Sequence, residues 1–138
     1  MLEIEQPDDL ISISLYNILT YRKDEEFINL IKDWNKTIVI HVIPFYPVTV
    51  IFEGNKIKFE RGEVKKANLK LKLEIDAMLD MANGRLGPVG AMLKGKLKIK
   101  GMFRVGTLLK FTKIFMKTMK MIAADPEIHF YEKKRIKQ

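Results

Sequence analysis

The segment GKLKIKG, residues 95–101, contains the most distinctive group of charged side chains in the chain. Two apolar residues alternate with three lysines, and this period of two is typical of a half-buried strand. With Lys94 just before it, the segment carries four positive charges and no acid. The sequence predicts a strand over 96–100 with its apolar residues turned inward, its lysines in water and a tight glycine turn at each end.

A second group of lysines recurs at helical spacing between residues 103 and 123, which we predict to form one long helix. Four lysines fall within an arc of about 80°, and an apolar face about 160° wide lies opposite them. The lysines are Lys110, Lys113, Lys117 and Lys120, and the centre of the apolar face is formed by Leu108, Phe111, Phe115, Met119 and Ile122. Such a face can seal an ordinary core, close an apolar cavity or dock on a membrane.

Positive charge is concentrated in the last third of the chain. The net charge of +8 divides into −2 for residues 1–93 and +10 for residues 94–138. This asymmetry indicates an anionic partner, either nucleic acid or an acidic membrane surface. The alternative is a solvated face that only keeps the protein soluble.

Methionine is also concentrated in one region. Apart from Met1, all seven methionines lie between residues 78 and 121. Methionine is unbranched and adaptable, so it suits a surface that must accommodate varied apolar ligands. A core selected only for packing would favour branched side chains.

Residues that could carry catalysis or bind a metal are few. The chain has no cysteine, and its two histidines, His41 and His129, are far apart in the sequence; we interpret both as structural or surface residues. Asp76 and Asp80 share a helical face, and we interpret them as a helix cap and a solvated residue. The sequence therefore predicts no catalytic residue, no metal site, no cofactor and no enzymatic activity.

The remaining patterns predict the elements that hold these groups. Helical spacing follows the acidic pair 8–9 and again follows Asp24, where the apolar stripe extends to Trp34. Strands are expected over 37–43, 48–52, 57–60 and 69–74, with a hairpin turn at 53–56. Asp76 is expected to cap a short helix that Gly84 ends. Another short helix follows from 87 to 94.

This order predicts an α+β fold, a five-stranded, mainly antiparallel sheet with helices packed against one face. We expect a single domain over 1–138, with its core at about 8–123 and a basic tail over 124–138. No apolar run reaches the roughly 18 residues of a membrane span. The acidic N-terminus does not resemble a targeting signal, so a cytoplasmic location is expected.

From Leu69 to Leu109 the chain resembles the sterol carrier protein type 2 domains. The resemblance rests on the strand 69–73, the helix closed by Gly84, and the run 92–101 with its Gly-Lys-Leu-Lys-Ile-Lys-Gly core. It continues through Gly106, and residues 10–68 agree in element order. Met102 and the Pro44–Pro47 turn depart from the family pattern, as do the long tail and the basic last helix.

The resemblance implies helices that enclose a hydrophobic tunnel, lipid ligands and no catalysis. The expected ligand is a fatty acid, acyl-CoA, isoprenoid, sterol or phospholipid. Together with the methionines and the apolar helix face, it predicts these tunnel residues: Trp34, Met78, Met81, Phe103, Leu108, Phe111, Phe115 and Met119. The four helix lysines, with the basic strand, are expected to contact anionic membranes.

Two other functions remain open. The domain could present a lipid-like substrate to a partner enzyme, which would use the same tunnel. It could also bind nucleic acid through its basic C-terminal third, although no recognition helix, RNA-binding signature or stacking aromatic accompanies the lysines. The sequence does not decide the oligomeric state.

Overall fold

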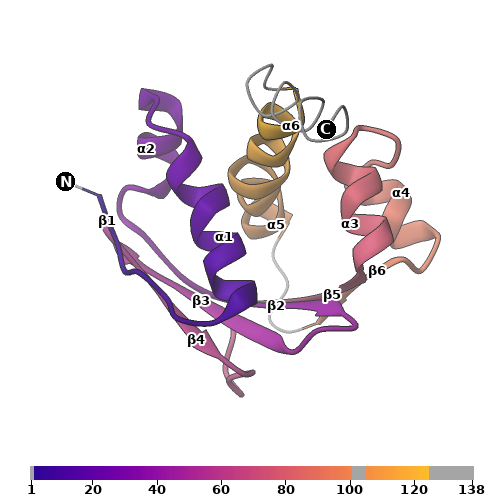
Figure 1. The fold of residues 1–138 in the computed structure, drawn as a ribbon, viewed down its shortest axis with the longest axis horizontal. Helices are drawn as coiled ribbons and strands as arrows, with labels where there is room; N and C mark the ends of the chain where they lie inside the picture. Colours follow the sequence, from indigo (N-terminus) through magenta and orange to yellow (C-terminus); the bar gives the residue numbers. More distant parts are fainter. Residues whose placement is uncertain (1, 101–104, 125–138) are drawn as a thin grey trace, which may run out of the picture.

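The computed structural model describes residues 2–100 and 105–124, which form one curved sheet with helices on a single face (Figure 1). The predicted residue Phe103 and nearly all of the predicted tail lie outside the described residues. The helices before the sheet are α1 (Leu10–Tyr21) and α2 (Glu25–Ile31). Those after it are α3 (Ile75–Ala82), α4 (Pro88–Leu93), α5 (Val105–Phe111) and α6 (Lys117–Ala123), the last two joined by the π-helical segment η1 (Thr112–Met116).

The sheet is mixed, and its strand order is β1-β4-β3-β2-β5-β6. The five predicted strands are present as β2 (Trp34–Ile43), β3 (Pro47–Gly54), β4 (Lys56–Arg61), β5 (Leu69–Glu74) and β6 (Leu97–Lys100). Three of the strand pairs are antiparallel, while β5 joins β2 in parallel. This confirms the predicted α+β fold.

A sixth strand, β1 (Glu3–Ile4), adds to the edge beside β4 and was not predicted. Two backbone bonds hold it, from Glu3 N–H to the Asn55 carbonyl and from Glu5 N–H to the Ile57 carbonyl, 2.7 and 2.8 Å long. A strand of two residues is too short to show a hydrophobic period. Strand β1 forms because β4 offers it a partner, so its own sequence gives no signal.

Alternation in the strands separates the core from the outer face of the sheet. Leu71 and Leu73 of β5 and Leu97 of β6 are buried in the core beneath the helices. Lys72 and Lys98, which alternate with them, are exposed on the opposite face. The predicted orientation of the basic strand is therefore correct.

Trp34 is not the end of a helical stripe, contrary to the prediction. The helix α2 ends at Ile31, and Asp33 adopts a left-handed conformation with φ of 58°. This conformation reverses the chain, so Trp34 becomes the first residue of β2. Its spacing from the α2 stripe is therefore coincidental.

The predicted cap of α3 is also wrong. Glu74 is the N-cap residue and makes no side-chain capping bond, while Asp76 lies within the first turn. An acid there still interacts favourably with the helix dipole. The end of the helix is as predicted: Gly84 has φ of 76°, and its N–H donates to the Met81 carbonyl, as expected for a glycine helix terminator.

The long C-terminal helix is interrupted by η1. The N–H of Lys117 donates to the carbonyl of Thr112, five residues earlier. The hydroxyls of Thr112 and Thr118 each bond the carbonyl four residues before them, Leu108 and Ile114. Such back-bonding often bends helices, and π-helical turns of this kind frequently occur at functional sites.

Candidate functional site: an apolar cavity under the C-terminal helix

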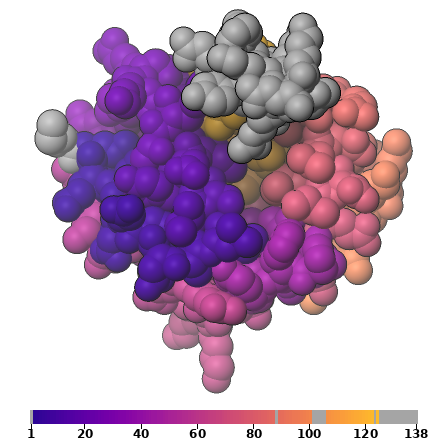
Figure 2. All heavy atoms as spheres, viewed as in Figure 1, coloured from indigo at the N-terminus to yellow at the C-terminus, as the bar shows by residue number. Residues whose placement is uncertain are grey.

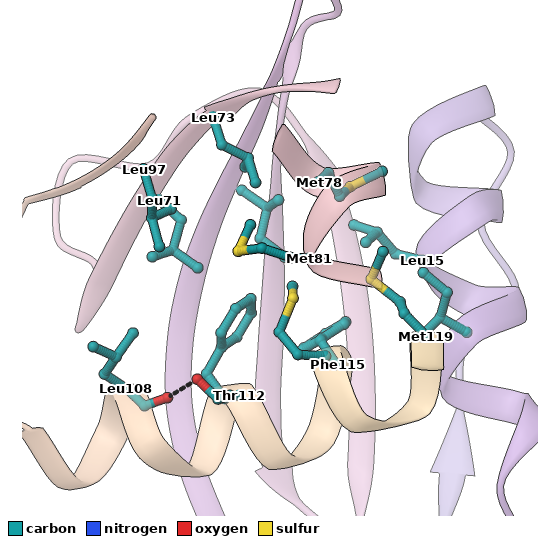
Figure 3. Close-up of a pocket in the computed structure, with 14 residues that line it drawn as sticks. Leu15, Leu71, Leu73, Met78, Met81, Leu97, Leu108, Thr112, Phe115 and Met119 are labelled. Atoms are coloured by element: carbon teal, nitrogen blue, oxygen red, sulfur yellow. Dashed lines mark hydrogen bonds between the residues drawn. The ribbon is translucent and has the colours of Figure 1, made fainter. Parts of the chain in front are cut away.

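An apolar cavity lies between the sheet and the C-terminal helical segments (Figure 3). Eight elements contribute to its wall, which places it at the centre of the fold. Thirteen of its fourteen lining residues are apolar, and the set is Leu15, Ile18, Ile40, Leu71, Leu73, Met78, Met81, Leu97, Leu108, Phe111, Thr112, Phe115, Met116 and Met119. In the space-filling view, the atoms of α6 show between α1 and α3 (Figure 2).

Among the described residues of the lining, the single polar one has its hydroxyl satisfied locally. Thr112 Oγ1 donates to the Leu108 carbonyl oxygen at 2.9 Å (Figure 3). None of the fourteen described lining residues is ionisable, so this part of the wall offers an occupant dispersion and hydrophobic contacts. An apolar molecule would lose no strong solvation by entering, whereas a charged group would be left unpaired.

The cavity is small in this conformation, about 30 Å³. Small-molecule pockets in proteins usually measure roughly 300–1,000 Å³. The space is therefore far smaller than a pocket that holds a whole small molecule. A lipid chain can enter only if part of the wall moves.

Four of the lining residues are methionines: Met78 and Met81 on α3, and Met116 and Met119 on the C-terminal segments. Met81 is buried, with 2% of its surface exposed, and the other three are partly buried. Because methionine has several low-energy conformers, this part of the wall can change shape without breaking a hydrogen bond.

The structure brings together six of the eight residues predicted to line the tunnel. Met78, Met81, Leu108, Phe111, Phe115 and Met119 all reach the cavity, and their binding of a ligand stays a prediction. Phe103 lies outside the described residues. Trp34 lies behind the wall: its ring is 4.7 Å from that of Phe52, which is 6.4 Å from that of Phe115.

Sequence reasoning missed the other half of the wall, which comes mainly from α1 and the strands. The alternation in β5 and β6 did predict that Leu71, Leu73 and Leu97 point inward. Nothing local to Leu15, Ile18 or Ile40 shows that they face a cavity, because that depends on how α1 and β2 pack across the sheet.

The four predicted membrane-contact lysines do not form one uniform stripe. Lys117 Nζ bonds Glu26 Oε1 at 2.7 Å, and Lys110 Nζ lies 5.4 Å from the centre of the Trp34 ring. Lys113 and Lys120 are exposed. The lysines of the basic strand β6 are exposed on the face of the sheet opposite the helices. The strand lysines and the helix lysines therefore cannot contact one flat surface together.

Metal and acid–base chemistry find little support in residues 2–100 and 105–124. No group of three or more His, Cys, Asp or Glu side chains is placed to hold a metal there. The ring of His41 makes a 2.8 Å hydrogen bond between Nε2 and the Phe45 carbonyl oxygen, which agrees with a structural role. His129 lies outside the described residues. No helix in the same residues is long and apolar enough to cross a membrane.

Three solved structures that share this fold are informative. A sterol carrier protein domain 2 of Helicoverpa armigera is 22% identical, with a TM-score of 0.54, over 83% of this chain and 92% of that one. The ubiquinone synthesis protein UbiJ-SCP2 is 12% identical, with a TM-score of 0.59, over 84% and 90%.

The third is the sec-alkylsulfatase Pisa1 from Pseudomonas sp., 16% identical with a TM-score of 0.59. The match covers 73% of this chain and only 16% of the alkylsulfatase. At these identities the likeness shows a shared fold.

No curated protein sequence matches this chain. The sequence profile of the SCP-2 sterol transfer family, however, matches residues 17–115. That segment includes the last five residues of α1, the whole sheet except β1, and the helices from α2 up to Phe115 in η1. The chain therefore belongs to the SCP-2 sterol transfer family.

Proposed function

We propose that this protein is an intracellular lipid carrier that holds an apolar lipid beneath its C-terminal helical segments and catalyses no reaction itself. The observation that carries the proposal is the central cavity, whose wall is apolar in thirteen of fourteen residues. A fatty acid, acyl-CoA, isoprenoid, sterol or phospholipid could present the necessary apolar chain or ring. The absence of cysteine from the sequence fits a reducing compartment.

The small volume of the cavity requires that loading be coupled to movement of the wall. The C-terminal segments are the part most suited to move, because side-chain packing and a few polar contacts hold them, whereas continuous backbone ladders hold β2 and β5. The π-helical η1 and the methionines on both sides of the cavity support this view.

A second candidate is an accessory domain that presents a lipid-like substrate to an enzyme. Two of the similar structures motivate it: one is described as a ubiquinone synthesis protein, and in the alkylsulfatase the matched region is a small part of a larger enzyme. The two candidates share the cavity and differ in the partner. Purification of this protein with one enzyme in stoichiometric amount would favour the second.

Native mass spectrometry of the purified protein, followed by organic extraction and lipid identification, tests the shared cavity. We expect a bound acyl or isoprenoid species whose removal leaves the apoprotein mass. If the protein is purified without lipid, titration with a fluorescent fatty acid provides the second measurement, with saturable binding of one molecule per chain as the expected result.

A matched pair of variants in α6 assigns the binding to the cavity. Met119→Glu places a carboxylate in the apolar wall, and we expect at least tenfold weaker fatty-acid binding because the charge would be buried without a partner. Met121→Glu makes the same change on an exposed residue of the same helix and should bind like the unchanged protein. Equal affinity in the two variants would contradict the proposed site.

A further inference from the structure

The exposed side of α4 carries an unusual group of apolar side chains. Val89, Met92 and Leu93 have 69%, 37% and 84% of their surface exposed. They are spaced at i, i+3 and i+4, so they share one face of the helix. Ala91, with 0% exposed, faces the core instead. The three side chains contribute little to the packing of the fold, and large exposed apolar groups in a cluster usually mark a contact surface.

Two lysines are held beside this apolar group by the turn that ends α4. Gly95 has φ of 71°, its N–H donates to the Met92 carbonyl, and the N–H of Lys96 donates to the Ala91 carbonyl. These two backbone hydrogen bonds form the Schellman motif, which fixes the residues around the helix end. Lys94 and Lys96 are both exposed, so their charges remain next to Leu93.

The basic character continues along β6 onto the outer face of the sheet. Lys98 lies directly opposite Lys72, and Lys100 opposite Lys70. Like charges in directly opposed positions destabilise a sheet. Of the four, only Lys70 has an acidic partner among the described residues, Glu63 at 4.0 Å. These side chains border a hollow of about 310 Å³ on a face that no described helix covers.

We infer that the α4–β6 edge, defined as Val89, Met92, Leu93, Lys94, Lys96 and Lys98, docks on the surface of an anionic lipid bilayer. Figure 1 shows α4 and β6 at the same end of the molecule, away from α2. The inference rests on the proposed function in one respect: a lipid carrier has to meet the membranes with which it exchanges lipid.

The combination of two kinds of side chain identifies the partner. A soluble polyanion would be attracted to the lysines but would leave the apolar side chains of α4 in water. A bilayer interface accepts both, because apolar residues enter the boundary between headgroups and acyl chains while lysines meet the anionic headgroups. Each lysine close to an acidic bilayer contributes about fivefold to partitioning.

The test is co-sedimentation of the full chain with vesicles of phosphatidylcholine, with and without phosphatidylserine. We expect binding only to the vesicles that contain phosphatidylserine, and weaker binding as salt is raised. The triple variant Lys94→Gln, Lys96→Gln, Lys98→Gln should partition at least tenfold less. Its matched control removes three exposed lysines elsewhere, Lys23→Gln, Lys32→Gln and Lys65→Gln, and should change partitioning by no more than about threefold, because only long-range attraction is lost.

The apolar contribution is tested by Val89→Ser with Leu93→Ser, for which we expect about tenfold weaker binding. Its control is Leu10→Ser, at a position that is 65% exposed on α1, and this variant should bind like the unchanged protein. Fluorescent fatty-acid binding in vesicle-free solution should be unaltered in every one of these variants, since none of the residues lines the cavity.

Three outcomes would overturn the inference: no binding of the unchanged protein to anionic vesicles, equal losses in the lysine variant and its control, or full binding by the Val89/Leu93 variant. The last outcome together with a loss in the lysine variant would indicate a soluble polyanion as the partner. Vesicle binding without fatty-acid binding would refute the carrier function and leave the docking edge intact.

Discussion

At the scale of single residues, Ser12 is the side chain whose burial is least compensated. It lies on α1 with 0% of its surface exposed, and its hydroxyl makes no hydrogen bond of good geometry with the described residues, although it is near enough to the Asp9 carboxylate to help lower the pKa of that group. A buried polar group without a partner costs roughly 1–3 kcal/mol, and alanine also favours the helix. We expect Ser12→Ala to leave the free energy of unfolding unchanged or raise it by about 1 kcal/mol, as measured by urea denaturation.

The appropriate comparison is Thr118, which is also fully buried but whose hydroxyl bonds the Ile114 carbonyl. Thr118→Val keeps the shape of the side chain and removes that bond, so it should lower the free energy of unfolding by about 1 kcal/mol. A loss in Ser12→Ala as large as the loss in Thr118→Val would mean that the Ser12 hydroxyl contributes to stability after all.

At the scale of elements, an electrostatic junction fastens the start of α2 to η1 and α6. The Arg22 side chain is 2% exposed and donates to both carboxylate oxygens of Asp24, at 2.8 and 2.7 Å. A third donor of Arg22 lies 3.4 Å from the Lys113 carbonyl oxygen within η1. Beside it, Lys117 of α6 bonds Glu26. Together these contacts tie the C-terminal segments to the N-terminal helices.

This junction should make stability depend on pH. The hydrogen bond from Arg22 lowers the pKa of Asp24 from 3.8 to about 2. Since the folded pKa lies below the unfolded one, the stabilisation is complete above about pH 5 and is lost as the pH falls towards about 2. The hydrogen bond from Lys117 lowers the pKa of Glu26 as well, with the same sign.

We therefore expect the urea midpoint to fall between about pH 5 and about pH 2, and Asp24→Asn to reduce that fall. Asparagine is the suitable replacement because it still caps helices well, so the acceptor for the Phe27 N–H remains while the charge is removed. Glu25→Gln, at an exposed neighbour, is the control and should retain the fall. If the urea midpoint of Asp24→Asn falls with pH as much as that of the unchanged protein, Asp24 is not the group responsible.

The same elements show how far sequence patterns reach. Alternation in β5 and β6, the β3–β4 hairpin and the glycine ends of α3 and α4 are local signals, and the structure agrees with each of them. The failures involve competition between local and long-range effects. The spacing of Trp34 from the apolar residues of α2 matched a helix, but Asp33 reverses the chain before it. The π-helical turn of η1 is a second case, because no periodicity distinguishes it from the α-helix around it. Half of the cavity wall comes from residues that meet only after the sheet and helices pack.

At the scale of the whole molecule, a cavity of only about 30 Å³ and a lipid ligand require two conformations. The sheet cannot supply the change, because β2 is bonded along its length to β3 and β5 and separating the strands would break many backbone bonds at once. The C-terminal segments can move away by exchanging side-chain contacts and the few bonds of the Arg22 junction. Lipid binding should therefore leave the sheet unchanged and act on η1 and α6.

Hydrogen exchange with and without saturating oleate tests this division of the molecule. A ligand at about 100 times its dissociation constant slows any opening that releases it by about 100-fold, so amides of η1 and α6 that exchange through such an opening should slow strongly. Amides of β3, which contributes no residue to the cavity wall, should change little. Protection spread equally over β3 and α6 would mean that oleate stabilises only the global fold. Protection of α6 that persists in Met119→Glu would place the lipid outside the cavity.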